Sequence, residues 1–264
     1  MKRRFFNADF TTLVKSLLWF LIRPRYYRHL TCSIKLKFFP NRNIEEIDFS
    51  AARWCEERAI SPKEAIFHIT GRYYEYSIKS IYKKEFRVAL KKVTSSPVRL
   101  GGGADIDLLY YLAEHFKVTN VIETGVAYGW SSLALLLSMQ KRQESKLIST
   151  DMPYQKFGSE KYIGCVVPNH LKYLWQLILL PDRQSIPILL GKFSSIDMCH
   201  YDSDKSYSGR IWAYQRIWSS LRNGGVFISD DISDNFAFRD FFQSKCYTLI
   251  IVRFSSKYIG IVIK

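Results

Sequence analysis

The stretch VIETGVAYGWSSLALLL, residues 121–137, decides the fold. It runs from an apolar strand through a turn of small residues into an apolar helix, and Gly125 and Gly129 suit a turn that approaches a ligand closely. The glycines alone are weak evidence, because ordinary strand–turn–helix connections share the pattern. Here Glu123 closes the strand, Ala127 lies between the glycines, and no Lys followed by Ser or Thr is present, so the loop favours a ligand without phosphate.

The chain around this stretch alternates between strands and helices, which predicts a parallel sheet built from βαβ units. The predicted strands are 119–124, 146–151, 173–180, 196–202 and 225–230, and the predicted helices are 104–116, 130–141, 185–194, 208–221 and 235–244. Only two residues join the last strands, Tyr247–Phe254 and Lys257–Ile263, so these must form an antiparallel hairpin. The expected fold class is α/β and Rossmann-like, with a mostly parallel sheet, an antiparallel C-terminal hairpin and an N-terminal helical extension.

Two parts of the chain are expected. Residues 1–95 are predicted to be a helical N-terminal cap that faces the substrate or a membrane, and residues 96–264 are predicted to be the α/β domain. The sequence from Ser61 to Glu64 fits a helix N-cap followed by a proline and an acid. Four tyrosines in this part favour core packing over a substrate-stacking surface, and they are Tyr73, Tyr74, Tyr76 and Tyr82.

Positive charge gathers in the first third of the chain. The net charge is +15, and residues 1–99 hold 21 Lys and Arg against 9 Asp and Glu. A basic face attracts nucleic acid, an anionic membrane or an acidic substrate by the same long-range field. Because the sequence contains no recognisable RNA-binding module, a nucleic-acid partner is disfavoured.

The apolar run Leu13–Ile22 is shorter than the roughly 20 residues that cross a bilayer. A small-residue cleavage site, as in a signal peptide, does not follow it. Two alternatives remain for this amphipathic helix. It packs on the α/β domain, or residues 1–30 make a peripheral membrane contact with Trp19, Phe20 and the following arginines as anchors.

The five cysteines are scattered and form no CxxC pair, which indicates a reduced cytoplasmic setting and no zinc site. Cys199 lies in an apolar run and is expected to be a small buried side chain. Peripheral association with the inner membrane face and a homo-oligomeric state both stay open.

Acidic residues follow several predicted strands, where the carboxyl ends of parallel strands meet a ligand. Asp151 ends the strand KLISTD at the separation at which folds of this type place a carboxylate that accepts two ribose hydroxyls. A surface aspartate is the alternative for Asp151. Asp182 follows the next strand, where a polar side chain is placed to contact an adenine edge. Ser131 and Ser132 are expected to cap the amides of the first helical turn.

The stretches IDMCHYDSDKSYSG (196–209) and LRNGGVFISDDISDN (221–235) should bring Asp202, Asp230 and Asp231 together. Three adjacent carboxylates repel unless a cation neutralises them, and Mg²⁺ suits oxygen ligands. Lys205 is the expected general base, since a partly desolvated lysine near a metal loses its proton near neutral pH. The alternatives are that an aspartate caps a turn, or that the lysine only pairs with an acid.

ETGVAYGWSSL, DSDKSY and LRNGGVFISDD resemble the motifs of class I S-adenosylmethionine-dependent methyltransferases of the cation-dependent O-methyltransferase group, which includes catechol and caffeoyl-coenzyme A O-methyltransferases. A group of bacterial methyltransferases from sugar, antibiotic and surface-glycan pathways is similar over more of the chain. Two positions depart from these patterns: the first group usually has Asn at position 231, and many members of the second have His at position 205.

The resemblance implies that S-adenosylmethionine and Mg²⁺ bind at the strand ends and that Lys205 and Asp202 are catalytic. The implied metal ligands are Asp202, Asp230 and Asp231. The implied cofactor residues are Glu123, Gly125, Ala127, Gly129, Ser131, Asp151, Asp182 and Asp202. The expected reaction is methyl transfer to a hydroxyl oxygen of a small-molecule or glycan acceptor. An RNA or protein methyltransferase that uses the basic N-terminal region is the alternative, although the NPPY-type amide-binding motif is absent from the sequence.

Overall fold

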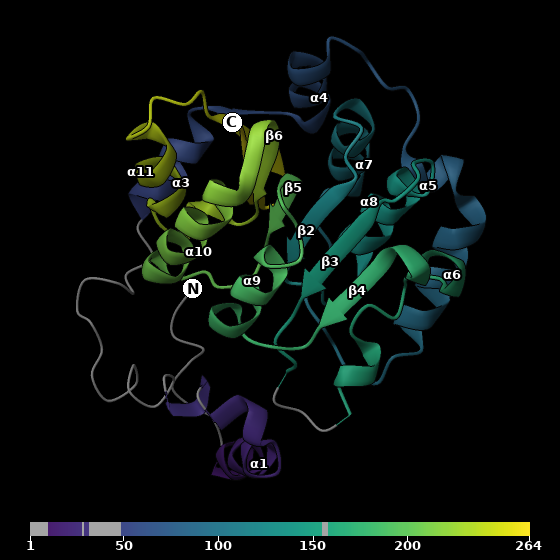
Figure 1. Cartoon of the computed structure of the whole chain (residues 1–264), viewed down its shortest axis with the longest axis vertical. Helices are drawn as coiled ribbons and strands as arrows, with labels where there is room; N and C mark the ends of the chain where they lie inside the picture. The colour runs from purple at the N-terminus through teal and green to yellow at the C-terminus, as the bar shows by residue number, and fades with distance from the viewer. Residues whose placement is uncertain (1–9, 28, 32–48, 155–157) are drawn as a thin grey trace.

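The computed structural model describes residues 10–27, 29–31, 49–154 and 158–264. Its centre is an eight-stranded sheet in the order β1-β7-β8-β6-β5-β2-β3-β4, with helices on both faces (Figure 1). The strands are β1 (Ala59–Ile60), β2 (Asn120–Thr124), β3 (Lys146–Thr150), β4 (Trp175–Ile178), β5 (Ile196–Tyr201), β6 (Leu221–Ser229), β7 (Ile250–Phe254) and β8 (Lys257–Ile263).

Helices precede and connect these strands. The α-helices are α1 (Phe10–Leu21), α3 (Phe49–Glu56), α4 (Pro62–Thr70), α5 (Ile78–Ile81), α6 (Lys83–Thr94), α7 (Ile106–His115), α8 (Trp130–Met139), α9 (Asp182–Leu190), α10 (Tyr207–Ser220) and α11 (Ala237–Gln243). Short 3-10 helices are η1 (Pro24–Tyr26), η2 (Glu160–Tyr162), η3 (Asn169–Leu174) and η4 (Ile232–Asp234).

The sheet has the predicted arrangement. Strands β2 to β6 pair in parallel, and β8 lies antiparallel between β6 and β7. The α/β fold class with an antiparallel C-terminal hairpin is therefore confirmed. The two-residue strand β1, which pairs in parallel with β7, was not anticipated, because so short a segment carries no periodic signal.

The buried core is divided between the two faces of the sheet, because side chains alternate between the faces along each strand. Val121 and Met198 pack with helices α4 to α8, whereas the following residues, Ile122 and Cys199, pack with α9, α10 and α11. Successive strand side chains point to opposite faces, so each central strand contributes to both layers. Cys199 is fully buried, as expected.

Helices α4, α5 and α6 belong to the same core as the sheet. Ser61 caps α4 in a reciprocal capping box with Glu64, which confirms the predicted helix start. Tyr74 and Tyr82 pack on the tyrosines of α7, as expected for core aromatics, whereas Tyr73 and Tyr76 are exposed. The core is therefore continuous across the expected boundary at residue 95.

The N-terminal segment forms a small cluster of its own at one end of the molecule (Figure 1). Trp19 and Phe20 are 0% and 2% exposed, and the Trp19 ring stacks on Tyr26 at 5.0 Å between centroids. The cluster contacts Met152 and Leu180 of the main body. The prediction that Trp19 and Phe20 are membrane anchors is therefore wrong, because both side chains are used for packing. Within the described ranges, no helix has the length and hydropathy needed to cross a membrane.

Trp19→Ala should release the N-terminal segment while the body stays folded, since this cluster is separate from the cores on the two sheet faces. Loss of a buried tryptophan removes about 3–5 kcal/mol of packing. Limited proteolysis should then cleave within residues 10–31 much faster, with an unchanged main melting transition. Leu18→Ala, at an exposed position of the same helix, is the control. Equal cleavage of both variants would contradict the packing described.

Candidate active site

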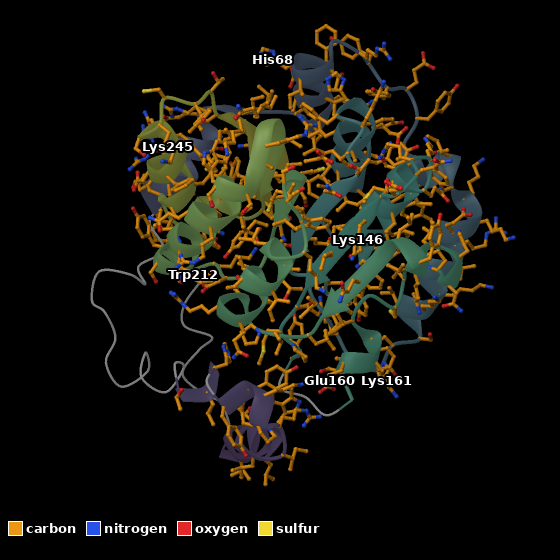
Figure 2. The ribbon with its side chains drawn as sticks, in the orientation of Figure 1. His68, Lys146, Glu160, Lys161, Trp212 and Lys245 are labelled. Atoms are coloured by element: carbon orange, nitrogen blue, oxygen red, sulfur yellow. The ribbon has the colours of Figure 1, made fainter. Side chains whose placement is uncertain are left out.

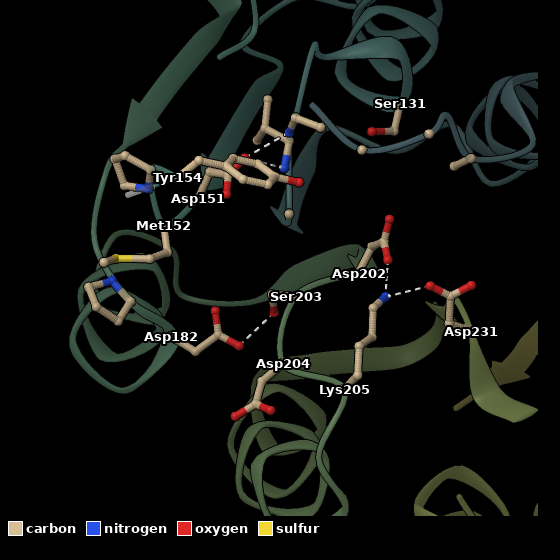
Figure 3. A pocket seen from close by; sticks show the side chains of 18 of the residues that line it. Ser131, Asp151, Met152, Tyr154, Asp182, Asp202, Ser203, Asp204, Lys205 and Asp231 are labelled. Carbon is tan, nitrogen blue, oxygen red and sulfur yellow. Dashed lines mark hydrogen bonds and ion pairs between the residues drawn. The ribbon is translucent and has the colours of Figure 1, made fainter. Parts of the chain in front are cut away.

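A cavity of about 980 Å³ opens where β2, β3 and β5 end (Figure 3). This volume lies at the upper end of the range of ligand pockets. The predicted site residues that line it are Gly125, Ala127, Ser131, Asp151, Asp182, Asp202, Lys205 and Asp231. Strand ends and the loops after them therefore bring together most, but not all, of the residues proposed from the sequence.

The loop between β2 and α8 requires glycine at two positions. Gly125 has φ of +79°, and a Cβ there would lie 2.1 Å from the backbone oxygen of Asp202. Gly129 has φ of +93° and a Cβ there would lie 2.9 Å from the Cα of Gly164. Gly125 thus joins the loop to the end of β5 at the cavity, whereas Gly129 packs on a neighbouring loop and does not line the cavity.

Asp151 holds this loop in place. Its Oδ2 atom accepts hydrogen bonds from the backbone amides of Val126 at 3.0 Å and Ala127 at 2.7 Å. Burial raises the pKa of this carboxyl to about 6, although the two amides oppose that rise. A carboxylate that is fixed by the loop and lines the cavity is suited to accept hydrogen bonds from a ligand.

Asp182 lies at the start of α9, on the same cavity wall. Its Oδ2 atom accepts hydrogen bonds from the hydroxyls of Ser203, at 2.5 Å, and Tyr201, at 3.2 Å. Burial raises the pKa of this carboxyl. The side chain therefore ties α9 to the end of β5, and it is not simply exposed.

Glu123 is fully buried beneath the cavity and does not line it. Its Oε2 atom accepts hydrogen bonds from Ser132, at 2.5 Å, and Ser149, at 2.6 Å. Ser132 is therefore not a cap of α8, as its position suggested, and no side chain caps that helix. The cofactor contact expected of Glu123 is not supported by this placement, because the carboxylate belongs to a buried network.

His200 completes that network because β5 lies between β2 and β6. The register pairs His200 with Glu123, and the imidazole lies 3.7 Å from the Glu123 carboxylate and 3.8 Å from that of Asp230. These contacts are longer than hydrogen bonds, so the attraction is ionic. Burial lowers the pKa of His200, but the two carboxylates raise it more, to about 10. A buried imidazolium thus lies between two buried acids and offsets part of their negative charge.

Lys205 lies between two acids at the cavity (Figure 3). Its Nζ atom donates a short hydrogen bond to Asp202 Oδ1 and lies 3.1 Å from Asp231 Oδ2. Burial lowers the pKa of Lys205, but both carboxylates raise it more, and the net shift is upward. In this arrangement Lys205 is an ammonium ion, which does not support the predicted loss of its proton near neutral pH.

A second lysine reaches the same acids from the C-terminal hairpin. Lys257 Nζ lies 3.3 Å from Asp231 Oδ1, so the two oxygens of Asp231 face two different ammonium groups. These groups lower the pKa of Asp231 against the effect of burial. Asp231 itself has φ of +53°, and the buried Arg210 holds its backbone oxygen at 2.7 Å.

These contacts do not fit the predicted metal site. Asp230 is turned toward His200 and does not line the cavity, while Asp202 and Asp231 hold Lys205 between them. Over the ranges that the structure describes, no group of three or more His, Cys, Asp or Glu side chains is arranged to hold a metal ion. Convergence of Asp202, Asp230 and Asp231 on one Mg²⁺ ion is therefore not seen, because lysines supply the positive charge.

Several residues that the sequence did not single out also line the cavity. They are His29, Gly101, Gly102, Gly103, Met152, Tyr154 and Lys257. Of these residues, only the three consecutive glycines formed a visible pattern in the sequence, and a Cβ at Gly103 would make an ordinary contact with the Trp130 ring at 3.5 Å. His29 and Lys257 reach the cavity from the two ends of the chain, and local pattern does not reveal such contacts.

Residues 122–232 match a family model described as a methyltransferase domain. An O-methyltransferase from Bacillus cereus, solved in complex with SAH, is similar with a TM-score of 0.54 and 14% identity, over 80% of this chain and 100% of that chain. TomG from Streptomyces achromogenes is an O-methyltransferase involved in tomaymycin synthesis and was solved with SAM. It is similar with a TM-score of 0.52 and 13% identity, over 76% of this chain and 96% of that chain. The SAH-bound methyltransferase PaMTH1 from Podospora anserina is similar with a TM-score of 0.51 and 12% identity, over 81% of this chain and 94% of that chain.

No curated protein matches the sequence of the chain. The family-model match and the shared fold confirm the predicted resemblance to class I methyltransferases. The matched region, residues 122–232, includes the loop after β2 and the acids that follow β3, β5 and β6.

His200→Gln should destabilise the fold, because it leaves Glu123 and Asp230 without the buried positive charge. Breaking a buried ion pair in this way costs about 3–5 kcal/mol. The pKa of His200 is about 10 in the folded chain and near 6.5 in the unfolded chain. The stabilisation by the imidazolium is therefore complete below pH 6.5 and is lost as the pH rises toward 10. The difference in free energy of unfolding between wild type and variant, measured with urea, should become smaller from pH 6.5 to 10. His68→Gln, at an exposed histidine, is the control. A difference in free energy of unfolding that stays constant over this pH range would contradict the charged state assigned to His200.

Proposed function

We propose that the protein transfers the methyl group of S-adenosylmethionine to a hydroxyl oxygen of an acceptor bound in the same cavity. The observation that carries this proposal is the ion pair of Lys205 with Asp202 at the rim of a cavity large enough for both molecules. The methyltransferase-domain match over residues 122–232 supports the reaction class. The Bacillus cereus O-methyltransferase and TomG, which share the fold, support oxygen as the methylated atom.

The cofactor side of the cavity fits this ligand. Asp151 presents a loop-anchored carboxylate that suits ribose hydroxyls, and Gly125 keeps the loop backbone close to the end of β5. S-adenosylmethionine carries no phosphate, which agrees with the absence of a Lys-Ser/Thr pair after the loop. When bound, it supplies an electrophilic methyl group on a sulfonium.

Lys205 and Asp202 are proposed to act on the acceptor as a pair. An attacking hydroxyl loses its proton as the bond from oxygen to the methyl carbon forms and the bond from carbon to sulfur breaks. Asp202 is suited to take that proton, because burial and the nearby Asp230 raise the pKa of its carboxyl. The Lys205 ammonium is suited to stabilise the negative charge that develops on the oxygen.

Lys257 is proposed to complete the positive side of this site in place of the divalent cation expected from the sequence. A Mg²⁺ ion held by Asp202 and Asp231 would have to displace the Lys205 ammonium that lies between them. The two lysines already place two positive charges next to these two carboxylates. We therefore propose that transfer proceeds without a divalent cation.

The acceptor is proposed to be a small molecule or a glycan with an accessible hydroxyl. Side chains from both ends of the chain, including His29 and Lys257, line the same cavity. Folds of this type take many acceptors, so a screen over phenols, sugars and lipid-linked glycans is the direct test. Transfer to an RNA or a protein, and none to these classes, would contradict the proposal.

The affinity for S-adenosylmethionine should fall as the pH decreases from 7.5 to 5. The pKa of Asp151 is raised to about 6, so the carboxyl becomes neutral below that pH and accepts hydroxyl donors less well. Titration calorimetry of the wild type and of Asp151→Asn at several pH values checks this. The variant should bind more weakly at pH 7.5 and lose most of the pH dependence. An unchanged affinity in Asp151→Asn would remove this residue from the cofactor site.

Lys205→Met and Asp202→Asn should each slow methyl transfer by roughly 10²–10⁴-fold, the usual effect of a positioned acid or base. Affinity for S-adenosylmethionine should change far less in Lys205→Met, since the ammonium acts on the acceptor. Transfer of a radiolabelled methyl group to an acceptor from the screen measures the rate. Lys192→Met, an exposed lysine outside the cavity, is the matched control. Rates near wild type in both Lys205→Met and Asp202→Asn would show that proximity alone drives transfer.

A further inference from the structure

Helix α1 carries a stripe of exposed apolar residues on the side away from its packed cluster. Val14, Leu18, Leu21 and Ile22 are 37%, 48%, 61% and 63% exposed, and we call them the outer stripe. Their spacing of four, three and one residues places them on one face of the helix. Because Trp19 and Phe20 bury the other face, α1 is apolar on two sides, and among the described residues only the Trp19 side packs on a partner.

The sequence around the outer stripe is strongly basic. Residues 1–31 contain seven Lys and Arg and one acidic residue. Arg25 and Tyr27, just after the stripe, are exposed, and the Tyr27 hydroxyl donates to the backbone oxygen of Leu21 at 2.6 Å. Apolar side chains next to exposed arginine and tyrosine fit the boundary between lipid headgroups and acyl chains. We propose that the outer stripe docks the protein on an anionic membrane surface.

Helix α1 is held firmly enough to serve as a docking element. Arg23 pairs with Glu160 at 3.0 Å and lies 4.5 Å from the centroid of the Trp19 ring. The Tyr26 hydroxyl donates to the backbone oxygen of Leu179 at 2.8 Å. Figure 2 places Glu160 and the exposed Lys161 at the same end of the molecule as α1. The stripe therefore has a fixed orientation relative to the body.

This end of the molecule also contains the cavity. The arrowheads of β3 and β4 point toward α1 in Figure 1, and His29, a few residues after the outer stripe, lines the cavity wall. A docked protein would bring the cavity close to the membrane, which suits an acceptor hydroxyl carried by a lipid. This consequence rests on the proposed function, whereas the docking itself does not.

Helix α6 is the competing surface, since it is also basic and has exposed apolar residues. Val88 and Leu90 are 46% and 56% exposed, and Ile81 just before the helix is 50% exposed. Val88 and Leu90 are two residues apart, so they point in different directions from the helix and form no stripe. Helix α6 has five Lys and Arg against one acidic residue, so a basic region without a stripe serves as the control for charge alone.

The test is sedimentation of the full-length protein with vesicles of phosphatidylserine and phosphatidylcholine, compared with vesicles of phosphatidylcholine alone, at low and high salt. The wild type should bind the anionic vesicles and release at high salt. The triple variant Leu18→Ser, Leu21→Ser, Ile22→Ser should bind at least about tenfold more weakly, because it loses apolar burial in the interface. The control Ile81→Ser, Val88→Ser, Leu90→Ser should bind like the wild type.

Three results would overturn the proposal. The wild type fails to bind anionic vesicles at low salt, or the α6 control loses binding as much as the stripe variant, or sedimentation equilibrium shows a wild-type dimer that the stripe variant abolishes without any vesicle binding. The last result would assign the stripe to a second copy of the chain. Unchanged resistance of residues 10–31 to limited proteolysis in the stripe variant shows that α1 is still packed. Unchanged S-adenosylmethionine affinity separates failure of docking from failure of the proposed function.

Discussion

Neutralisation of acids that the sheet brings together is the constraint on which this site depends. Parallel strands β2, β5 and β6 end at one edge, so Glu123, Asp202, Asp230 and Asp231 lie close to one another. Like charges at such distances oppose ionisation unless cations are present. His200 offsets part of the negative charge of Glu123 and Asp230 below the cavity, and Lys205 and Lys257 neutralise Asp202 and Asp231 at its rim. The charged residues at the rim line the cavity, and the buried group around His200 lies beneath them.

Much of the fold and part of the site could be predicted from the sequence. Apolar strands ending in acid or glycine have a clear local pattern, and the two-residue link before Lys257 permits only an antiparallel hairpin. The positions of Gly125, Asp151, Asp202 and Lys205 at the cavity followed from where their strands end. These predictions needed only local sequence and the rule that ligands bind at the carboxyl edge of a parallel sheet.

What the sequence did not reveal depends on register and on contacts between distant segments. Lys257 reaches Asp231 because β8 pairs with β6 so that Gly260 lies opposite Ser229, and nothing local fixes that register. The role of His200 depends on its pairing with Glu123 across β5 and β2. The protonated state of Lys205 follows from two acids whose distances are known only in the folded chain. The sequence therefore indicated that acids follow these strands, but it did not reveal which side chains carry the opposite charge.

The most direct test of the ammonium-based site is the rate of methyl transfer in excess EDTA compared with the rate after Mg²⁺ is added, with an acceptor from the screen. If Lys205 and Lys257 supply the positive charge beside Asp202 and Asp231, the rate in EDTA should equal the rate with Mg²⁺. Loss of transfer in EDTA, with full recovery on addition of Mg²⁺, would contradict this account and assign the acids to a metal ion.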